Sequence, residues 1–415
     1  MTKGTRRAKK SRTAFSADTW MGHLGKYAPD VRLRDLVIPG THDSDTYTLR
    51  ADWGMVPNHP LPEWLMRVFE YFPWTRKYAV DWGKAQRLSV LQQLEAGVRY
   101  LDLRFALRAE DHGVYTCHGL YGQPAVNLFL EIRTFLNQHP REVVFLDIQE
   151  LNNMQDADKK QFLETLQTLF GDKMAPVLLG TEVTLGKMQQ KGFQLITFLN
   201  NQDIPFRVQS NRFWPRNNTL ASLWINTPKL DELKEGLKKA ALEHQQKYSE
   251  EFFVMQAMRT PDTSMVVEGL TDPDDDVPHS LADLAKFTNP AVMSWFGGHE
   301  LIPNIFIMDD CSAVDFMSVV MGLNHGISGI RGKCLPVNQT QPAPVSGQKS
   351  ADIHRKLGSC PLKIVRNKHP ALTAGSDPVI AKKAAPEPML VAGIPDVPPL
   401  RPVPSFGRYP GRCPG

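Results

Sequence analysis

The sequence is poor in cysteine and contains no long apolar run. Five cysteines occur among 415 residues, too far apart to suggest a zinc site or a disulfide framework. They are Cys117, Cys311, Cys334, Cys360 and Cys413. No apolar segment approaches the length of a membrane span, and no apolar signal region follows the basic N-terminus. We therefore expect reduced thiols, a cytoplasmic location, and neither a signal peptide nor a transmembrane segment.

Basic residues are concentrated at the two ends of the chain, although the net charge is only +4. Residues 1–12 carry six Lys and Arg and no acid, and residues 336–415 carry 11 Lys and Arg against four Asp and Glu. The part between them therefore has an excess of acid. Basic tails can be attracted to anionic lipid headgroups, at about 1 kcal/mol per residue close to the surface, or they can simply be solvated.

Composition divides the chain into three parts. Residues 1–16 are basic, small and polar, and we expect them to be disordered. Residues 17–335 are expected to fold as one domain, since 42% of the whole chain is hydrophobic. Residues 336–415 hold 15 of the 32 prolines and are expected to form an extended, disordered tail. Its residues 398–404 could bind a protein partner of the SH3 type.

Strands and helices alternate along the middle of the chain. The expected strands are residues 33–38, 98–105, 114–117, 143–148, 193–199, 252–257 and 304–309. The expected helices are residues 89–96, 126–138, 157–170, 230–247 and 314–323. This alternation predicts an α/β fold, either a parallel barrel or a doubly wound sheet. A long connection, residues 51–82, holds four of the eight tryptophans and predicts either a membrane-facing rim or a cap over the fold.

Polar residues follow three of the expected strands. His42 and Asp43 come after the first apolar run, Asp102 and Arg104 lie at the end of the second, and His118 ends the third. The carboxyl ends of parallel strands commonly form an active site. Two histidines can supply a general base and a general acid, and a guanidinium can offset charge on phosphoryl oxygens. The set predicts acid/base cleavage of a phosphodiester.

Three segments resemble the X domain of phosphatidylinositol-specific phospholipase C. They are residues 38–44 (IPGTHDS), residues 92–104 (QQLEAGVRYLDLR) and residues 117–119 (CHG). The resemblance is to the bacterial-type branch, which includes the X-domain-only proteins of eukaryotes, and it extends from about residue 36 to residue 324. It implies a distorted (β/α) TIM-type barrel, with a single catalytic domain between the two tails.

The resemblance also implies roles for individual residues. His42 matches the general base that takes the proton from the inositol 2-hydroxyl, and His118 matches the general acid that protonates the diacylglycerol oxygen. Asp43 matches the carboxylate that assists His118. Asp309 matches the carboxylate that orients His42, and its neighbour Asp310 leaves this match uncertain by one position.

Arg104 distinguishes the metal-independent branch of the family. Calcium-dependent relatives have an acid at this position and an Asn after the first histidine, where this chain has Arg104 and Asp43. The resemblance therefore implies catalysis without a metal or other cofactor. We expect Asp102 to pair with Arg104 or with the substrate. Further substrate contacts are expected from Gln149, at a strand end, and from Trp214.

The expected activity is a phospholipase C reaction that releases diacylglycerol and inositol cyclic phosphate at a phospholipid membrane surface, with no nucleic-acid partner. Two alternatives stay open. The same fold could act on another phospholipid or on glycosylated phosphatidylinositol, or it could serve as a non-catalytic lipid-binding or scaffold protein. A glycerophosphodiesterase-like barrel is disfavoured, because it would need a Glu after the first histidine and a metal-binding acid cluster.

Overall fold

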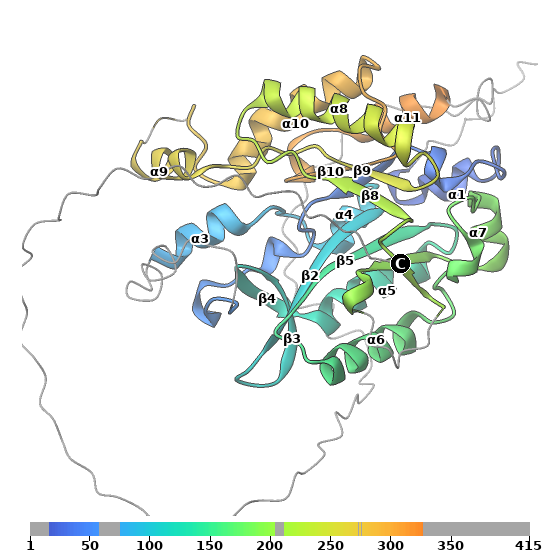
Figure 1. Cartoon of the computed structure of the whole chain (residues 1–415), viewed down its shortest axis with the longest axis horizontal. Helices are drawn as coiled ribbons and strands as arrows, with labels where there is room; N and C mark the ends of the chain where they lie inside the picture. Colours follow the sequence, from blue (N-terminus) through green and yellow to red (C-terminus); the bar gives the residue numbers. More distant parts are fainter. Residues whose placement is uncertain (1–15, 58–74, 204–210, 273, 275, 327–415) are drawn as a thin grey trace, which may run out of the picture. The chain divides into compact units, whose positions relative to one another are not determined.

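Eight parallel strands form a curled sheet in the order β8-β9-β10-β1-β2-β5-β6-β7 (Figure 1). The computed structural model describes residues 16–57, 75–203, 211–272, 274 and 276–326. The parallel strands are β1 Ile38–Thr41, β2 Tyr100–Arg108, β5 Val144–Asn152, β6 Leu195–Leu199, β7 Phe213–Pro215, β8 Leu220–Leu223, β9 Phe252–Gln256 and β10 Ile305–Met308. Within these ranges β7 and β8, which follow each other in the chain, are not paired. The sheet is therefore a distorted, open barrel, which confirms the predicted fold class.

A hairpin extends the sheet beside β2. Strands β3 (Gly113–His118) and β4 (Leu120–Pro124) pair antiparallel with each other, and β3 pairs antiparallel with the last part of β2. Because β3 runs back along β2, its final residue His118 returns towards the middle of β2, where Arg104 lies.

Helices cover the outside of the barrel. They are α1 Trp20–Leu24, α3 Arg76–Gly83, α4 Val90–Glu95, α5 Ala125–Gln138, α6 Asp156–Phe170, α7 Leu185–Lys191, α8 Leu230–Lys247, α9 Thr263–Thr271, α10 Leu281–Gly297 and α11 Met317–Gly326. In Figure 1, α5 and α6 lie below the strands and α8, α10 and α11 above them. The hairpin, α3 and α9 lie at one end of the barrel, and α1 and α7 lie at the other.

Side chains that alternate along the strands build two cores. The inner core contains residues that point into the barrel, such as Tyr100, Phe145 and Phe252, and the outer core lies between the strands and the helices. Gly40 leaves room inside the barrel, since a Cβ there would lie 2.9 Å from Ile307 Cγ2 and 3.0 Å from Tyr100 Cβ. Packing on both faces explains why the strands read as continuous apolar runs.

Several elements differ from the sequence prediction. The first strand begins at Ile38, and Leu33–Asp35 is a short 3₁₀ helix. Helix α10 was not expected because Pro290 lies inside it, and β7 and β8 are too short to show a periodicity. Most of the tryptophan-rich connection and nearly all residues of both predicted tails lie outside the described residues. No helix within the described ranges is long and apolar enough to cross a membrane.

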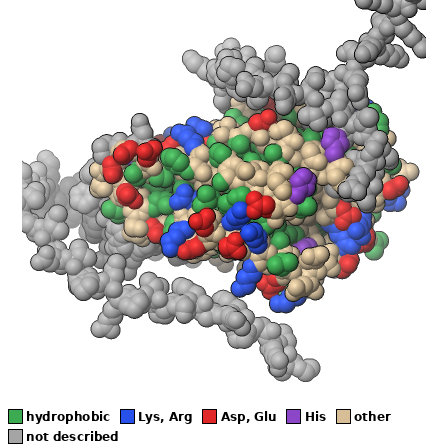
Figure 2. Space-filling model, turned by 90° about the horizontal axis from the view of Figure 1, so that it is seen from above, with side chains coloured by type: hydrophobic (Ala, Val, Ile, Leu, Met, Phe, Trp, Pro, Cys, Tyr) green, Lys and Arg blue, Asp and Glu red, His purple; other side chains and the backbone are tan. Residues whose placement is uncertain are grey.

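The outer face of the upper helices carries both signs of charge. Seen from that side, Lys and Arg side chains lie among Asp and Glu side chains, with apolar side chains between them (Figure 2). Helix α8 contributes ion pairs between Lys238 and Glu235 and between Lys247 and Glu243, at 3.0 Å each. Such pairs on an exposed face favour solubility and contribute little to stability.

A buried ion pair joins three segments at the α1 end of the barrel. Arg99 and Glu142 are fully buried, and Nε and Nη2 of Arg99 donate to Glu142 Oε2 at 2.9 and 2.7 Å. Glu142 also accepts the backbone N–H of Met21 and Gly22, while Arg99 donates to the carbonyl of Asp18. The pair therefore connects the segment around α1 with the residues that precede β2 and β5.

We predict that Glu142→Ala lowers the free energy of unfolding by about 3–5 kcal/mol, because it leaves the buried Arg99 charge without its partner. Chemical denaturation would measure this change. Glu235→Ala, which removes an exposed pair on α8, serves as the control and should cost less than about 1 kcal/mol. Equal effects of the two substitutions would contradict the assignment of Arg99 and Glu142 as the tie between these segments.

Candidate active site

The register of the parallel strands places His42 beside Asp309. Thr41 of β1 pairs with Met308 of β10, so the residues that follow them leave the two strands side by side. Nδ1 of His42 lies 2.8 Å from Oδ1 of Asp309, and this contact orients the imidazole. The neighbouring Asp310 faces away and forms an ion pair with Arg87 at 2.5 Å. Asp309 is therefore the late-strand carboxylate that contacts His42.

Asp43 lies at the centre of the site. Its fully buried carboxylate is 3.3 Å from Nε2 of His42, 3.3 Å from Nε2 of His118 and 2.7 Å from Nε of Arg104. The backbone of Asp43 has a φ of +42°, a left-handed conformation that Asp tolerates better than most residues. This turn directs the carboxylate back into the barrel, so that one side chain meets both imidazoles and the guanidinium.

His118 reaches the site from the β3–β4 hairpin. Its Nδ1 lies 2.8 Å from the carbonyl of Gly83, at the end of α3. A carbonyl only accepts hydrogen bonds, so Nδ1 carries a proton and Nε2 faces Asp43. The ring centroids of His42 and His118 are 6.5 Å apart. The two imidazoles therefore face each other across Asp43.

Arg104 is held among three carboxylates. Besides Asp43, its guanidinium lies 3.5 Å from Asp102 Oδ2 and 3.6 Å from Glu150 Oε1, and its Nη2 is 3.5 Å from Nε2 of His42. Burial opposes the charge, but the three carboxylates outweigh it and raise the pKa of Arg104. The side chain is 17% exposed, so part of it remains accessible to solvent.

The same carboxylates control the protonation of His42. Burial disfavours the imidazolium, but Asp43 and Asp309 overcome this effect and raise the pKa of His42 to about 9. Burial also raises the pKa of Asp309 and Asp102. Asp45, fully buried two residues after Asp43, has a pKa raised well above its ordinary value by burial and by the neighbouring acids.

Three potential ligand atoms in the site lie close enough together to surround a cation. They belong to His42, Asp43 and Asp102 and fall within 4.8 Å of one another. The guanidinium of Arg104, however, already contacts both carboxylates and lies next to Nε2 of His42. A cation there would face a fixed positive charge, so we do not identify these residues as metal ligands.

Gln149 and Trp214 are placed differently from the expectation. Trp214 is fully buried in the inner core, where it packs against Phe198 and Phe252 and donates from Nε1 to the carbonyl of Ala175. Its side chain therefore has no exposed surface in this structure. Gln149 lies where the register between β2 and β5 shifts by one residue, so that Arg104 pairs with Glu150 instead of Gln149. Glu150 is therefore the residue of β5 whose carboxylate contacts Arg104.

A buried charge network lies beside the site and was missed in the sequence. Asp147 on β5 accepts from Arg216 Nη1 at 2.8 Å and from the hydroxyl of Tyr100, and burial raises its pKa to about 6. The sequence did contain a signal for Arg216, because it is an arginine that directly follows the three apolar residues of β7.

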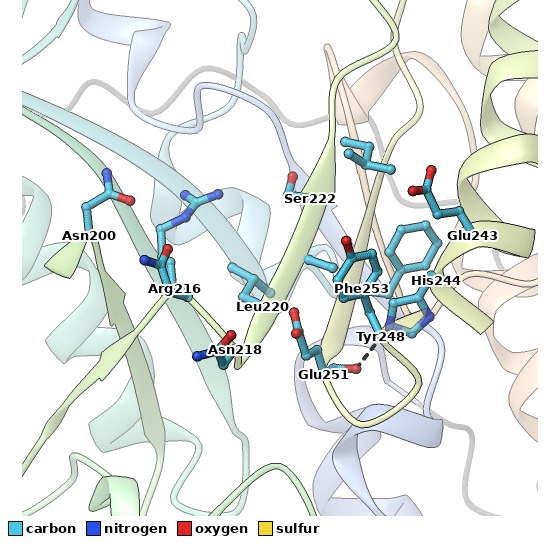
Figure 3. Close-up of a pocket in the computed structure, with 13 residues that line it drawn as sticks. Asn200, Arg216, Asn218, Leu220, Ser222, Glu243, His244, Tyr248, Glu251 and Phe253 are labelled. Carbon is cyan, nitrogen blue, oxygen red and sulfur yellow. Dashed lines mark hydrogen bonds between the residues drawn. The ribbon is translucent and has the colours of Figure 1, made fainter. Parts of the chain in front are cut away.

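Arg216 also lines a hollow of about 530 Å³ next to the edge of β8 that has no paired strand among the described residues. There it lies with Asn200 and Asn218 on one side, opposite His244 and Phe253 (Figure 3).

We predict that the imidazole of His42 titrates at about pH 9 in the free protein. Asp309→Asn should lower this pKa, because the charge that favours the imidazolium is lost while the burial remains. An NMR titration, assigned with His42→Ala, measures both values. Asp310→Asn is the matched control, since that carboxylate faces Arg87. A His42 pKa that Asp309→Asn leaves unchanged would contradict the electrostatic role of this pair.

Comparison with known proteins agrees with this fold. The PI-PLC X family model matches residues 80–208, which include Arg104 and His118 but not His42 or Asp309. Solved structures of phosphatidylinositol-specific phospholipase C are similar in fold. The Listeria monocytogenes enzyme gives a TM-score of 0.52 at 18% identity, covering 74% of this chain and 98% of that one. A Staphylococcus aureus variant gives 0.51 at 16% identity, covering 74% and 97%.

The similarity to proteins with related sequences covers most of the barrel. PI-PLC X domain-containing protein 3 of Danio rerio is 30% identical over 312 residues, which cover 74% of this chain and 92% of the relative. The human protein of the same name is also 30% identical, covering 74% and 93%. Variant-surface-glycoprotein phospholipase C of Trypanosoma cruzi is 27% identical, covering 68% and 77%. The chain belongs to the family of PI-PLC X domain-containing proteins.

Proposed function

We propose that this protein is a metal-independent phospholipase C that cleaves phosphatidylinositol to diacylglycerol and inositol cyclic phosphate. The observation that carries the proposal is the Asp43 carboxylate, which contacts two imidazoles and a guanidinium at the mouth of the barrel. These groups match the three requirements of phosphodiester cleavage, which are a base, an acid and a fixed positive charge.

The two histidines would divide the proton transfers. His42, oriented by Asp309 through Nδ1, would take the proton of the inositol 2-hydroxyl on Nε2 as the oxygen attacks phosphorus. His118, whose Nδ1 proton is donated to Gly83, would deliver a proton from Nε2 to the departing diacylglycerol oxygen. The bond from phosphorus to that oxygen breaks, and the cyclic 1,2-phosphate remains on the inositol.

Arg104 would stabilise the charge on the phosphoryl oxygens. Its guanidinium is fixed by Asp43 and presents several donors in one plane, a geometry that suits phosphate. A permanent charge at this position can replace the electrostatic contribution that a calcium ion supplies elsewhere. Glu150 and Asp102 limit the motion of Arg104 and are candidates for contact with the headgroup.

The raised pKa of His42 sets the expected pH dependence. A base must be unprotonated, so with a pKa of about 9 only about one molecule in a hundred is competent at pH 7. The rate on a soluble substrate should therefore rise on the acidic side of its pH profile as His42 loses its proton. It should fall again where the general acid loses its own proton, so the profile is bell-shaped. Since the substrate is a lipid, we also propose peripheral contact with a phospholipid surface.

A second candidate substrate is a glycosylated phosphatidylinositol. The similarity to a variant-surface-glycoprotein phospholipase C supports this alternative. The hollow beside Arg216 is lined by amide, hydroxyl and aromatic side chains together with two glutamates and several aliphatic residues, and its polar groups suit the hydroxyls of a sugar. Parallel assays with plain and glycosylated phosphatidylinositol would distinguish the two substrates.

Incubation with phosphatidylinositol vesicles in excess chelator should produce an inositol cyclic phosphate signal in the phosphorus NMR spectrum. His42→Ala should reduce the rate by several orders of magnitude, because each proton transfer contributes about 10²–10⁴-fold and the two histidines act as a unit. Activity that disappears in chelator and returns with calcium would refute metal independence. Near-normal activity of His42→Ala would refute the assignment of the base.

Arg104→Lys should lower kcat by about 10²–10³-fold, the usual effect of losing one preorganised donor to a developing negative charge. The matched control is Arg108→Lys on the same strand, because Arg108 pairs with Asp111 and stacks on Trp53 away from the site. A kcat that falls equally in both variants would argue against a direct contact between Arg104 and the phosphoryl group.

A further inference from the structure

Gln86 is a fully buried polar residue that contacts the backbone around the His42–Asp309 pair without touching either side chain. It lies in the connection between α3 and α4. Its Nε2 donates to the carbonyl of His42 at 3.0 Å and to the carbonyl of Met308 at 2.8 Å. Its Oε1 accepts the backbone N–H of Cys311 at 3.1 Å. The side-chain amide therefore bridges the ends of β1 and β10.

The position of this amide matters because the strands stop where the reactive residues begin. The register between β1 and β10 ends at Thr41 and Met308. One more backbone hydrogen bond, from the N–H of His42 to the carbonyl of Met308 at 3.0 Å, extends this pairing by one residue on the β1 side. Gln86 continues the connection by binding the carbonyl of His42 itself and the backbone on both sides of Asp309. The side chains of His42 and Asp309 leave the backbone at these points.

We propose that Gln86 is a positioning residue, whose amide fixes the distance between His42 and Asp309 and so sets the geometry of the general base. This proposal rests on the proposed function, and it assigns to Gln86 no contact with substrate. The bridge requires both amide protons and the carbonyl oxygen, so an apolar side chain of similar length cannot replace it.

The segment that carries Gln86 also contacts the other histidine. The carbonyl of Gly83 accepts from Nδ1 of His118, and the carbonyl of Ala85 accepts from the backbone N–H of Asp310. Thr46 Oγ1 accepts hydrogen bonds from the backbone N–H groups of Ala85 and Gln86 and donates one to the carbonyl of Asp43. Residues 83–86 therefore connect the surroundings of both imidazoles, and Gln86 is the side chain that serves His42.

The test is Gln86→Met, which keeps the length and removes the hydrogen bonds. We expect kcat at the pH optimum to fall by about 10²-fold, the effect of a misplacement of about 1 Å, with KM unchanged. The pKa of His42, measured by NMR, should fall as the contact with Asp309 weakens. Four other ionisable side chains also face His42, and Gln86 contacts none of them. They are those of Asp43, Asp102, Arg104 and His118.

Gln194→Met is the matched control. Gln194 is another buried glutamine, and its Nε2 donates to the carbonyl of Leu136 in the last turn of α5 and to that of His139 just after the helix. Its substitution should reduce stability similarly while leaving the His42 pKa and kcat unchanged. If Gln86→Met does not fold, Gln86→Asn keeps an amide but is one methylene too short, and the same decrease in pKa is expected.

Two results would overturn the proposal. One is a folded Gln86 variant in which the His42 pKa and the kcat at the pH optimum are unchanged. The other is an equal loss in the Gln86 and Gln194 variants, as expected of a merely structural residue. The NMR measurement needs no activity. If the protein cleaves no phosphodiester but the Gln86 variant still shows the decrease in the His42 pKa, the proposed function is refuted and the positioning role of Gln86 remains.

Discussion

The carboxylate of Asp43, buried between two imidazoles and a guanidinium, is the interaction on which the site depends. A charge in this position would be costly if it were unpaired. The guanidinium and the two imidazoles beside it stabilise the carboxylate, which in turn holds these three groups close to one another. Each neighbour comes from a different element, namely the loop after β1, strand β2 and the hairpin.

Because the strands are parallel and in register, ionisable residues of neighbouring strands lie at the same level of the barrel and form a layer. Gly40 and Thr41 of β1 pair with Tyr100 and Leu101 of β2, so His42 comes next to Asp102. On β5, Asp147 pairs with Asp102. The layer therefore places Asp309, His42, Asp102 and Asp147 around one end of the barrel. Inward-facing residues one step below them, including Tyr100 and Phe145, are aromatic or aliphatic and form its floor.

The electrostatic balance of this layer favours positive charge. Carboxylates outnumber the cations, which explains both the raised pKa of His42 and the raised pKa of Arg104. In the proposed reaction the same excess would weaken the binding of an anionic headgroup, and the partly exposed guanidinium of Arg104 would offset this effect. Backbone contacts such as those of Gln86 then determine the distances at which these charges interact.

The sequence was sufficient to predict the α/β class, most of the long helices and five residues that the fold brings into one cluster: His42, Asp43, Arg104, His118 and Asp309. Apolar runs and strand-end polar residues are local signals, and they indicated four of these residues, whereas Asp309 was found through the family resemblance. The contacts of Glu150, Arg216 and Gln86 and the burial of Trp214 were not predicted. These features depend on a strand irregularity, a short strand and a loop. Only tertiary structure decides such contacts, because they join segments that are far apart in the chain.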